Sequence, residues 1–347
     1  MLWHLNFDAL SLCNVEVAYI ASFFGDPSHL NLFNVSDIFS YCYLSGSSFM
    51  CGIVGLFLKD KALEVNLGRM LSDMLLSMSD RGPDSAGIAI YRKHQSGRSK
   101  FTVQSEIGKV DYAAIQNNLS TVLDTDLKIK QNDTHAVIDV DNKSSDKLRS
   151  SIEVGHPNIR IMSEGEKIEI YKEIGLPIDV LKRFKIYEMD GSHAVGHTRM
   201  ATESAVTTDG AHPYSTGSDQ CLVHNGSLSN HNSLRRKLIQ EGFQIESEND
   251  TEVGAAYLSW KMATGSSLRD ALKSSLCDLD GFFTFVVGTK DGFGVLRDPI
   301  ACKPAVLAET DQFVAFGSEY RALVKLPGVE HANVWEPEPA TVYFWGH

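Results

Sequence analysis

Lys and Arg are scarce in this chain, and its first 49 positions contain neither. Lys and Arg together number 32 against 44 Asp and Glu, which gives a formal net charge of -12. Nucleic-acid binding needs Lys and Arg to neutralise phosphates, so this balance argues against a nucleic-acid partner. No uncharged apolar run reaches the roughly eighteen residues of a membrane-spanning helix, so no membrane association is expected.

Cysteines in metal-binding patterns are also missing. The six cysteines include no Cys-x-x-Cys pair and no Cys/His spacing typical of zinc, so we expect no metal and no cofactor. A secretory signal would need a basic first region, which this chain lacks. A cytoplasmic protein with reduced thiols is therefore expected.

Residues 1–49 differ in composition from the rest of the chain. They hold only four acidic residues and many aromatic ones. Three interpretations are open: a genuine extension, a pro-segment that is later removed, or upstream sequence translated because the start was set too early. We favour the last, and expect residues 1–49 to be absent from the mature protein.

From residue 51 onward, apolar runs predict strands and helical spacing predicts separate helices. Helices are expected at 63–78, 230–241 and 251–276, and polar turns at 290–292 and 310–312 predict two hairpins. Strands are expected at 51–58, 85–91, 193–202, 220–229, 281–289, 292–298 and 305–318. Strands grouped with separate helices predict packed sheets covered by helices, an α+β fold.

The segment at about 92–191 is the least regular part of the sequence. Its middle is polar and rich in turn residues, whereas 168–184 has helical periodicity interrupted by Pro177. We expect this segment to form an inserted subdomain or lid.

The stretch "SSFMCGIVGLF" places a Met-Cys pair before an apolar strand, as at the start of a mature chain. If Cys51 were the first residue, it would carry both a thiol and a free α-amine. That amine has a pKa of about 7.7–8.0, so it could accept the proton of the attacking thiol. Taken alone, Cys51 is equally a small buried side chain of a strand.

Two further motifs each have an ordinary and a functional interpretation. In "RGPDSAG", Arg81 and Asp84 flank a Gly-Pro turn, which by itself predicts only a type I or II turn. In "GHTRMATES", Arg199 and Thr202 offer a fork and a hydroxyl for a carboxylate, although a surface ion pair is the commoner fate of an arginine.

Two later motifs also have both an ordinary and a functional interpretation. Asn225-Gly226 is typical of a type I′ hairpin turn, but its amide and N–H could also stabilise an oxyanion. The preceding His224 is interpreted as a core histidine and not as a base. Asp250 stands where a helix N-cap is expected, and could instead bind a substrate ammonium group.

In their order and spacing, these motifs resemble the class II (N-terminal nucleophile, Ntn) glutamine amidotransferases. Cys-Gly-Ile-x-Gly, Arg-Gly-x-Asp-Ser-Ala-Gly, Gly-His-Thr-Arg-x-Ala-Thr, His-Pro, His-Asn-Gly and Asp-Thr/Ser-Glu all occur between Cys51 and Glu252. "LRDPIACKP" and "FGSEYRAL" are similar to later segments of the family. The resemblance covers residues 51–347 and implies a four-layer αββα sandwich with two packed antiparallel sheets.

The resemblance also implies the chemistry. Cys51 matches the nucleophile with its own amine as base, and Asn225 and Gly226 match the oxyanion hole. The thiolate would attack the side-chain amide of L-glutamine, release ammonia and leave a thioester for water to hydrolyse.

Other positions match residues that bind glutamine or support its pocket. Arg199 matches the ligand of the α-carboxylate, Asp250 the ligand of the α-ammonium, and Thr202 another pocket contact. Arg81, beside Asp84, matches the support of the loop that closes over glutamine, and His212 a structural histidine of the pocket.

Members of the family normally carry a synthase domain that consumes the ammonia, and residues 51–347 leave no room for one. The resemblance therefore implies an ammonia-accepting synthase subunit on a separate chain, as in glutamate-synthase-like and N-methylglutamate synthase complexes. Two alternatives remain: a non-catalytic glutamine-sensing or scaffolding subunit if residues 1–49 are retained, and an Ntn amidohydrolase acting on acylated amines. A pair such as Arg199 and Asp250, which suits a zwitterion, argues against the second.

Overall fold

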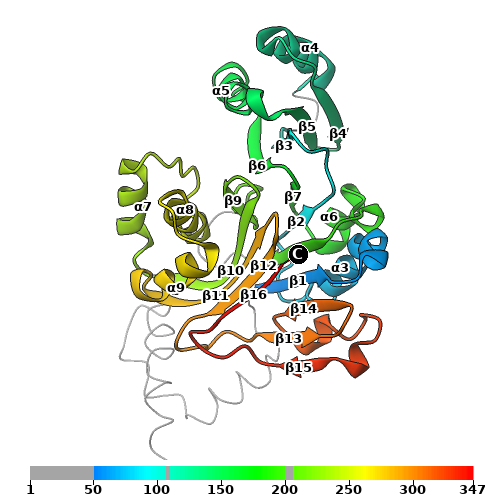
Figure 1. Ribbon diagram of the computed structural model, residues 1–347, viewed down its shortest axis with the longest axis vertical. Helices are drawn as coiled ribbons and strands as arrows, with labels where there is room; N and C mark the ends of the chain where they lie inside the picture. The colour runs from blue at the N-terminus through cyan, green and yellow to red at the C-terminus, as the bar shows by residue number, and fades with distance from the viewer. Residues whose placement is uncertain (1–50, 107–109, 201–205, 347) are drawn as a thin grey trace, which may run out of the picture. The chain divides into compact units, whose positions relative to one another are not determined.

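The computed structural model describes residues 51–106, 110–200 and 206–346. Seven strands form one sheet: β1 (Gly52–Leu58), β2 (Ser85–Tyr91), β7 (Ile168–Ile174), β8 (His193–Arg199), β13 (Val306–Glu309), β14 (Phe313–Gly317) and β15 (Asn333–Trp335). Five form a second: β9 (Tyr214–Gly217), β10 (Gln220–Leu228), β11 (Gly281–Thr289), β12 (Gly292–Arg297) and β16 (Val342–Gly346). Their orders are β15-β13-β14-β1-β8-β2-β7 and β16-β12-β11-β10-β9, and neighbouring strands run antiparallel (Figure 1).

Strand β1 shows why the two sheets stack on each other. Its side chains alternate between the two faces of the sheet, as strand geometry requires. Val54, Leu56 and Leu58 belong to the cluster under the helices. Ile53 and Phe57 join a different cluster, which includes side chains of β10, β11 and β12 in the second sheet. Both faces of β1 are therefore buried, one by helices and the other by the second sheet.

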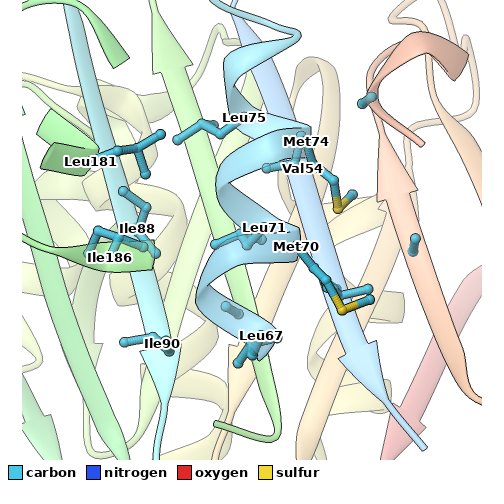
Figure 2. Packing of buried hydrophobic residues seen from close by; sticks show 14 of the residues in the cluster. Val54, Leu67, Met70, Leu71, Met74, Leu75, Ile88, Ile90, Leu181 and Ile186 are labelled. Carbon is cyan, nitrogen blue, oxygen red and sulfur yellow. The ribbon is translucent and has the colours of Figure 1, made fainter. Parts of the chain in front are cut away.

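Helices cover the outer face of each sheet. Helices α3 (Leu67–Leu76) and α6 (Pro177–Arg183) pack on the seven-stranded sheet, and Figure 2 shows the apolar face of α3 against side chains of β1 and β2. Helices α7 (His231–Gln240), α8 (Asp250–Ala263) and α9 (Leu268–Asp278) cover the other sheet. The fold is the expected α+β sandwich of four layers, αββα.

A third, four-stranded sheet lies within the segment 92–191. It consists of β3 (Arg98–Gln104), β4 (Lys128–Asn132), β5 (His135–Asp141) and β6 (Arg160–Gly165) in the order β4-β5-β3-β6. With helices α4 (Tyr112–Leu123) and α5 (Ser145–Gly155), this sheet encloses a hydrophobic cluster of its own.

The predicted helical periodicity over 168–184 is wrong for its first half. Residues 168–174 form β7, an edge strand of the seven-stranded sheet, and only the residues from Pro177 onward are helical. The alternation of Ile168 and Ile170, both buried, is a strand pattern. Pro177 lies in the first turn of α6, where its missing N–H costs no hydrogen bond.

Two predicted helices are divided differently, whereas both hairpins are confirmed. The first consists of a 3₁₀ helix (Lys61–Asn66) followed by α3. The second is split into α8 and α9 around Gly265, whose φ of 99° only glycine adopts readily. The hairpins β11–β12 and β13–β14 surround the two predicted turns.

Asp219 joins the four-stranded sheet to the five-stranded one. It lies in the turn between β9 and β10 with a φ of 53°, and it is almost fully buried. Its carboxylate accepts hydrogen bonds from the N–H groups of Glu166, Lys167 and Ile168 at 2.7, 2.7 and 3.1 Å. Its own N–H donates to the carbonyl of Glu164 at 2.8 Å. One side chain therefore accepts hydrogen bonds from three successive N–H groups where β6 turns into β7.

Replacing Asp219 by alanine is expected to lower the free energy of unfolding by about 3 kcal/mol, because one buried and two partly buried N–H groups lose their acceptor. Asp219→Asn is the matched control: asparagine tolerates a positive φ and keeps one acceptor oxygen, so its cost should be smaller. Urea denaturation of both variants measures the difference. Equal midpoints for Asp219→Ala and the unchanged protein would show that the turn does not depend on this carboxylate.

Candidate active site

Three separate segments meet at Cys51, immediately before the central strand β1. Arg81 Nε and Asn225 Nδ2 each donate to the carbonyl oxygen of Cys51, both at 3.2 Å. The Cys51 thiol donates to the carbonyl oxygen of Met200, with 3.9 Å between sulfur and oxygen. Residues far apart in sequence are thus brought together around one half-buried thiol.

The surroundings of Cys51 hold its thiol in the protonated form. Burial raises the pKa of the thiol above its usual value, and this outweighs the opposite effects of the Met200 carbonyl contact and the charges of Arg199 and Lys303. A thiol in this state needs a nearby base before it can act as a nucleophile.

Arg81 is fixed by a part of the chain that the predictions left without a role. Its guanidinium is buried, and Nη1 donates to the carboxylate of Glu319, which also pairs with Arg321 at 2.6 Å. Glu319 belongs to the segment "FGSEYRAL", so the resemblance pointed to this segment without assigning the residue. Neighbouring Ser318 accepts a hydrogen bond from the N–H of Ile53 in β1 at 2.9 Å.

The Arg81–Asp84 turn packs backbone against backbone on the end of β8. The N–H of Asp84 donates to the carbonyl of Arg199 at 3.1 Å. A Cβ at Gly82 would lie 2.5 Å from the backbone nitrogen of Arg199, so only glycine permits this approach. The turn thereby connects the segment that holds Cys51 to the strand that ends in Arg199.

The surface ion pair considered for Arg199 is wrong, because this side chain is 5% exposed. It ends β8, and its Nη1 would lie 3.0 Å from a Cβ placed on Gly210. Thr202, the other predicted contact of this segment, lies outside the described residues.

Asn225 and Gly226 do not form a hairpin turn, as their dipeptide pattern suggested. Both lie inside β10, paired with Thr284 and Phe283 of β11. Gly226 has a φ of 145°, and a Cβ on it would lie 1.9 Å from the carbonyl oxygen of Phe282. The pairing with β11 therefore overrides the turn preference, and the glycine is required by the close approach of another backbone.

Asp250 is not the N-cap of α8; Asn249 is, because its side chain accepts from the N–H of Thr251. As the first residue of the helix, Asp250 instead accepts from the N–H of Leu228 in β10 at 2.8 Å. Burial favours its neutral form, but His224, whose Nδ1 lies 3.7 Å from Oδ1, and the N–H of Leu228 outweigh that effect and lower the pKa of Asp250 to about 2. The carboxylate is therefore ionised and attached to the strand of Asn225.

Three histidines lie close together, and one of them, His224, lies beside Asp250. His197 and His212 stack with 4.1 Å between ring centroids, and His197 Nε2 donates to the carbonyl of His224 at 3.2 Å. Burial lowers the pKa of His197 to about 3 and that of His212 well below its usual value. Both rings are consequently neutral. His224 is a core residue, as its sequence context indicated, and is 3% exposed.

Lys172, in β7, was not identified from the sequence. Its ammonium donates to the carbonyls of Ala211 at 2.8 Å and Pro213 at 3.3 Å, the two neighbours of His212, and lies 4.4 Å from the ring centroid of Tyr214. Burial lowers the pKa of Lys172 to about 7. No sequence signal could have found this residue, because its segment was predicted as a helix.

A cavity of about 990 Å³ lies between β6, β9 and the connection from α7 to α8. Lys172, Tyr214 and Glu252 line it, but Cys51 does not. It is therefore separate from the group of residues around the thiol. Over the described ranges, no three His, Cys, Asp or Glu side chains are placed to hold a metal ion. In the same part of the chain, no helix is long and apolar enough to cross a membrane.

Comparison with known proteins identifies the family of this chain. The glutamine amidotransferase domain family matches residues 197–325. The chain is 61% identical over 298 residues to the glutamine amidotransferase-like protein GlxB of Rhizobium meliloti, covering 86% of this chain and 99% of that protein. It is 31% identical over 304 residues to a putative glutamine amidotransferase of Methanothermobacter thermautotrophicus, covering 85% and 99%.

Among solved structures, the glutamine phosphoribosylpyrophosphate amidotransferase of B. subtilis is similar with a TM-score of 0.55 at 19% identity. The match covers 85% of this chain and 47% of that one, and defines an Ntn-type amidotransferase fold. The chain belongs to the glutamine amidotransferases, and within them it is an enzyme of class II.

Proposed function

We propose that this chain is a glutaminase subunit that hydrolyses the side-chain amide of L-glutamine through a thioester on Cys51. The observation that carries the proposal is the convergence on Cys51: Arg81 and Asn225 both donate to its carbonyl, and its sulfur faces Met200. An ordinary buried cysteine would not need two side chains from distant segments to fix its backbone.

The proposed base is the α-amine of Cys51 itself, which requires a mature chain that begins at this residue, without residues 1–49. Burial raises the pKa of the thiol, so an unassisted thiolate would be scarce near neutral pH. An α-amine with a pKa of about 7.7–8.0 is well matched to take up that proton.

The proposed substrate contacts bind the two charged groups of a free amino acid. Arg199 would bind the α-carboxylate, Asp250 the α-ammonium, and Thr202 would complete the pocket. The burial of Arg199 and the ionised state of the partly buried Asp250 support this assignment, since each offers a charge of the sign required. Arg81 and Asp84 would support the pocket through their hydrogen bonds to the backbone of Cys51 and Arg199, and His212 through its stack on His197.

The reaction would proceed in two steps. The sulfur forms a bond to the amide carbon, and the resulting oxyanion is stabilised by the side-chain amide of Asn225 and the N–H of Gly226. The proton held by the amine passes to the leaving nitrogen, and the C–N bond breaks to release ammonia. Water then attacks the γ-glutamyl thioester and releases glutamate, which restores the thiol.

We further propose that the ammonia passes to a synthase subunit on a separate chain, of the glutamate-synthase or N-methylglutamate-synthase type. The GlxB relative is matched over 99% of its length, so the region shared with this chain makes up almost all of that protein. In this proposal the complex is cytoplasmic, and 92–191 is an inserted subdomain with its own small core. Co-purification of the protein from its native source would identify the partner.

Protein prepared to begin at Cys51 is expected to release ammonia and glutamate from L-glutamine in equal amounts. N-acetyl-L-glutamine is the matched control. Because it lacks the charge that Asp250 would bind, it should react roughly a hundredfold more slowly. Ammonia release without glutamate would contradict the reaction. Equal rates on both compounds would contradict the zwitterion pocket and favour an amidohydrolase of another kind.

A further inference from the structure

The hydroxyl of Thr251 lies at the centre of a buried group of polar side chains. Its Oγ1 is 3.2 Å from His212 Nε2, 3.1 Å from His224 Nδ1 and 3.4 Å from Asp250 Oδ1. Thr251 is 1% exposed, and both histidines are buried. A hydroxyl can donate one hydrogen bond and accept two. With three partners, it must therefore donate to one of them and accept from the other two.

The unpartnered nitrogens of the two rings decide where the protons are. Within the described part of the chain, His212 Nδ1 and His224 Nε2 are buried and have no hydrogen-bond partner. A buried N–H without an acceptor is rarer and more costly than a bare lone pair. Each ring therefore carries its proton on the other nitrogen, which is the one that faces Thr251.

It follows that both rings donate to Thr251. The two N–H groups occupy both lone pairs of Oγ1, so its own proton must point elsewhere. The remaining neighbour is Asp250 Oδ1, which as an ionised carboxylate can only accept. The Asp250 oxygens are then held separately. Oδ1 accepts from the Thr251 hydroxyl, with His224 Nδ1 slightly farther away at 3.7 Å, and Oδ2 accepts from the N–H of Leu228.

We propose that Thr251 is a positioning residue that orients the Asp250 carboxylate toward the ammonium of the substrate, with His212 and His224 directing its proton. This inference rests on the proposed function, because it assumes that Asp250 binds that ammonium. Two hydrogen bonds leave lone pairs free on the carboxylate, so it can still accept from the substrate.

The proposal predicts an effect on KM rather than on kcat. The substrate ammonium is bound equally in the ground state and the transition state, so a misplaced carboxylate weakens both alike. Thr251→Val removes the hydroxyl while conserving shape, and should raise KM for glutamine roughly tenfold with kcat nearly unchanged. Thr251→Ser keeps the hydroxyl and should restore KM.

Asp250→Asn measured in the same assay separates the two proposals. If Asp250→Asn leaves KM unchanged, the substrate assignment itself is wrong. If Asp250→Asn raises KM but Thr251→Val does not, only the positioning role is wrong. A fall in kcat and thermal stability at constant KM would make Thr251 a structural residue and overturn the inference.

A second measurement needs no substitution and remains decisive if Thr251→Val does not fold. Imidazole nitrogen chemical shifts of the unchanged protein report the tautomer of each histidine. The proposal requires a proton on Nε2 of His212 and on Nδ1 of His224. The opposite tautomer in either ring would leave Thr251 a free lone pair and overturn the proton assignment.

Discussion

Cys51→Ala is expected to abolish glutamine hydrolysis, with a rate indistinguishable from that of buffer. The sulfur is the proposed nucleophile, and alanine provides no atom that could form the thioester. Ammonia release measured on protein beginning at position 51 tests the prediction. The matched control is Cys277→Ala, since Cys277 is an exposed free thiol remote from the site and should be dispensable.

The role of the Cys51 α-amine can be tested separately by changing where the chain begins. Protein that retains residues 1–50 keeps the Cys51 thiol but has no free amine there. Since burial raises the pKa of this thiol, loss of the base should reduce hydrolysis nearly as far as loss of the sulfur. Hydrolysis at the full rate by the longer chain, confirmed intact by mass, would remove the α-amine from the mechanism.

The second largest effect is expected for Asn225→Ala, which should lower kcat by roughly 10²–10³ with little change in KM. Losing one donor to an oxyanion typically costs this much, because the donor acts mainly on the charge that develops in the transition state. The Asn225 amide already reaches Cys51, where it donates to the carbonyl oxygen at 3.2 Å.

Steady-state rates for Asn225→Ala and Asn225→Asp test this assignment. Aspartate conserves the shape but replaces the donor by a negative charge, so it should be at least as inactive as alanine. Asn333→Ala, in the exposed part of β15, is the control that should leave kcat unchanged. An Asn225→Ala variant with normal kcat would show that this amide only positions Cys51.

Much of the molecule follows from short-range patterns. The apolar runs at β1 and β2, the helical spacing in α3 and the turns at 290–292 and 310–312 were predicted correctly. Each depends on neighbours within one element, where side-chain period and turn chemistry dominate. The order of the motifs likewise pointed to the amidotransferase class before any contact was known.

Long-range pairing overruled the local patterns in other places. Asn225-Gly226 has the composition of a turn. Pairing with β11, whose Phe282 carbonyl lies close to Gly226, makes the dipeptide part of an extended strand instead. Residues 168–174 were predicted helical, but the free edge of β2 pairs with them and makes them β7. Propensity is a weak preference that the hydrogen bonds and burial of a sheet can exceed.

The sequence by itself therefore determined the class of enzyme, the four-layer fold and the identity of Cys51, Arg199, Asn225 and Asp250 as candidates. Only the tertiary structure decided what holds them. Glu319 pairs with Arg81, the N–H of Leu228 donates to Asp250, and Thr251 lies between His212 and His224. The physical reason is that a motif records residue types along the chain. Hydrogen bonds between buried groups depend on which backbone and side-chain atoms folding brings within about 3 Å of each other.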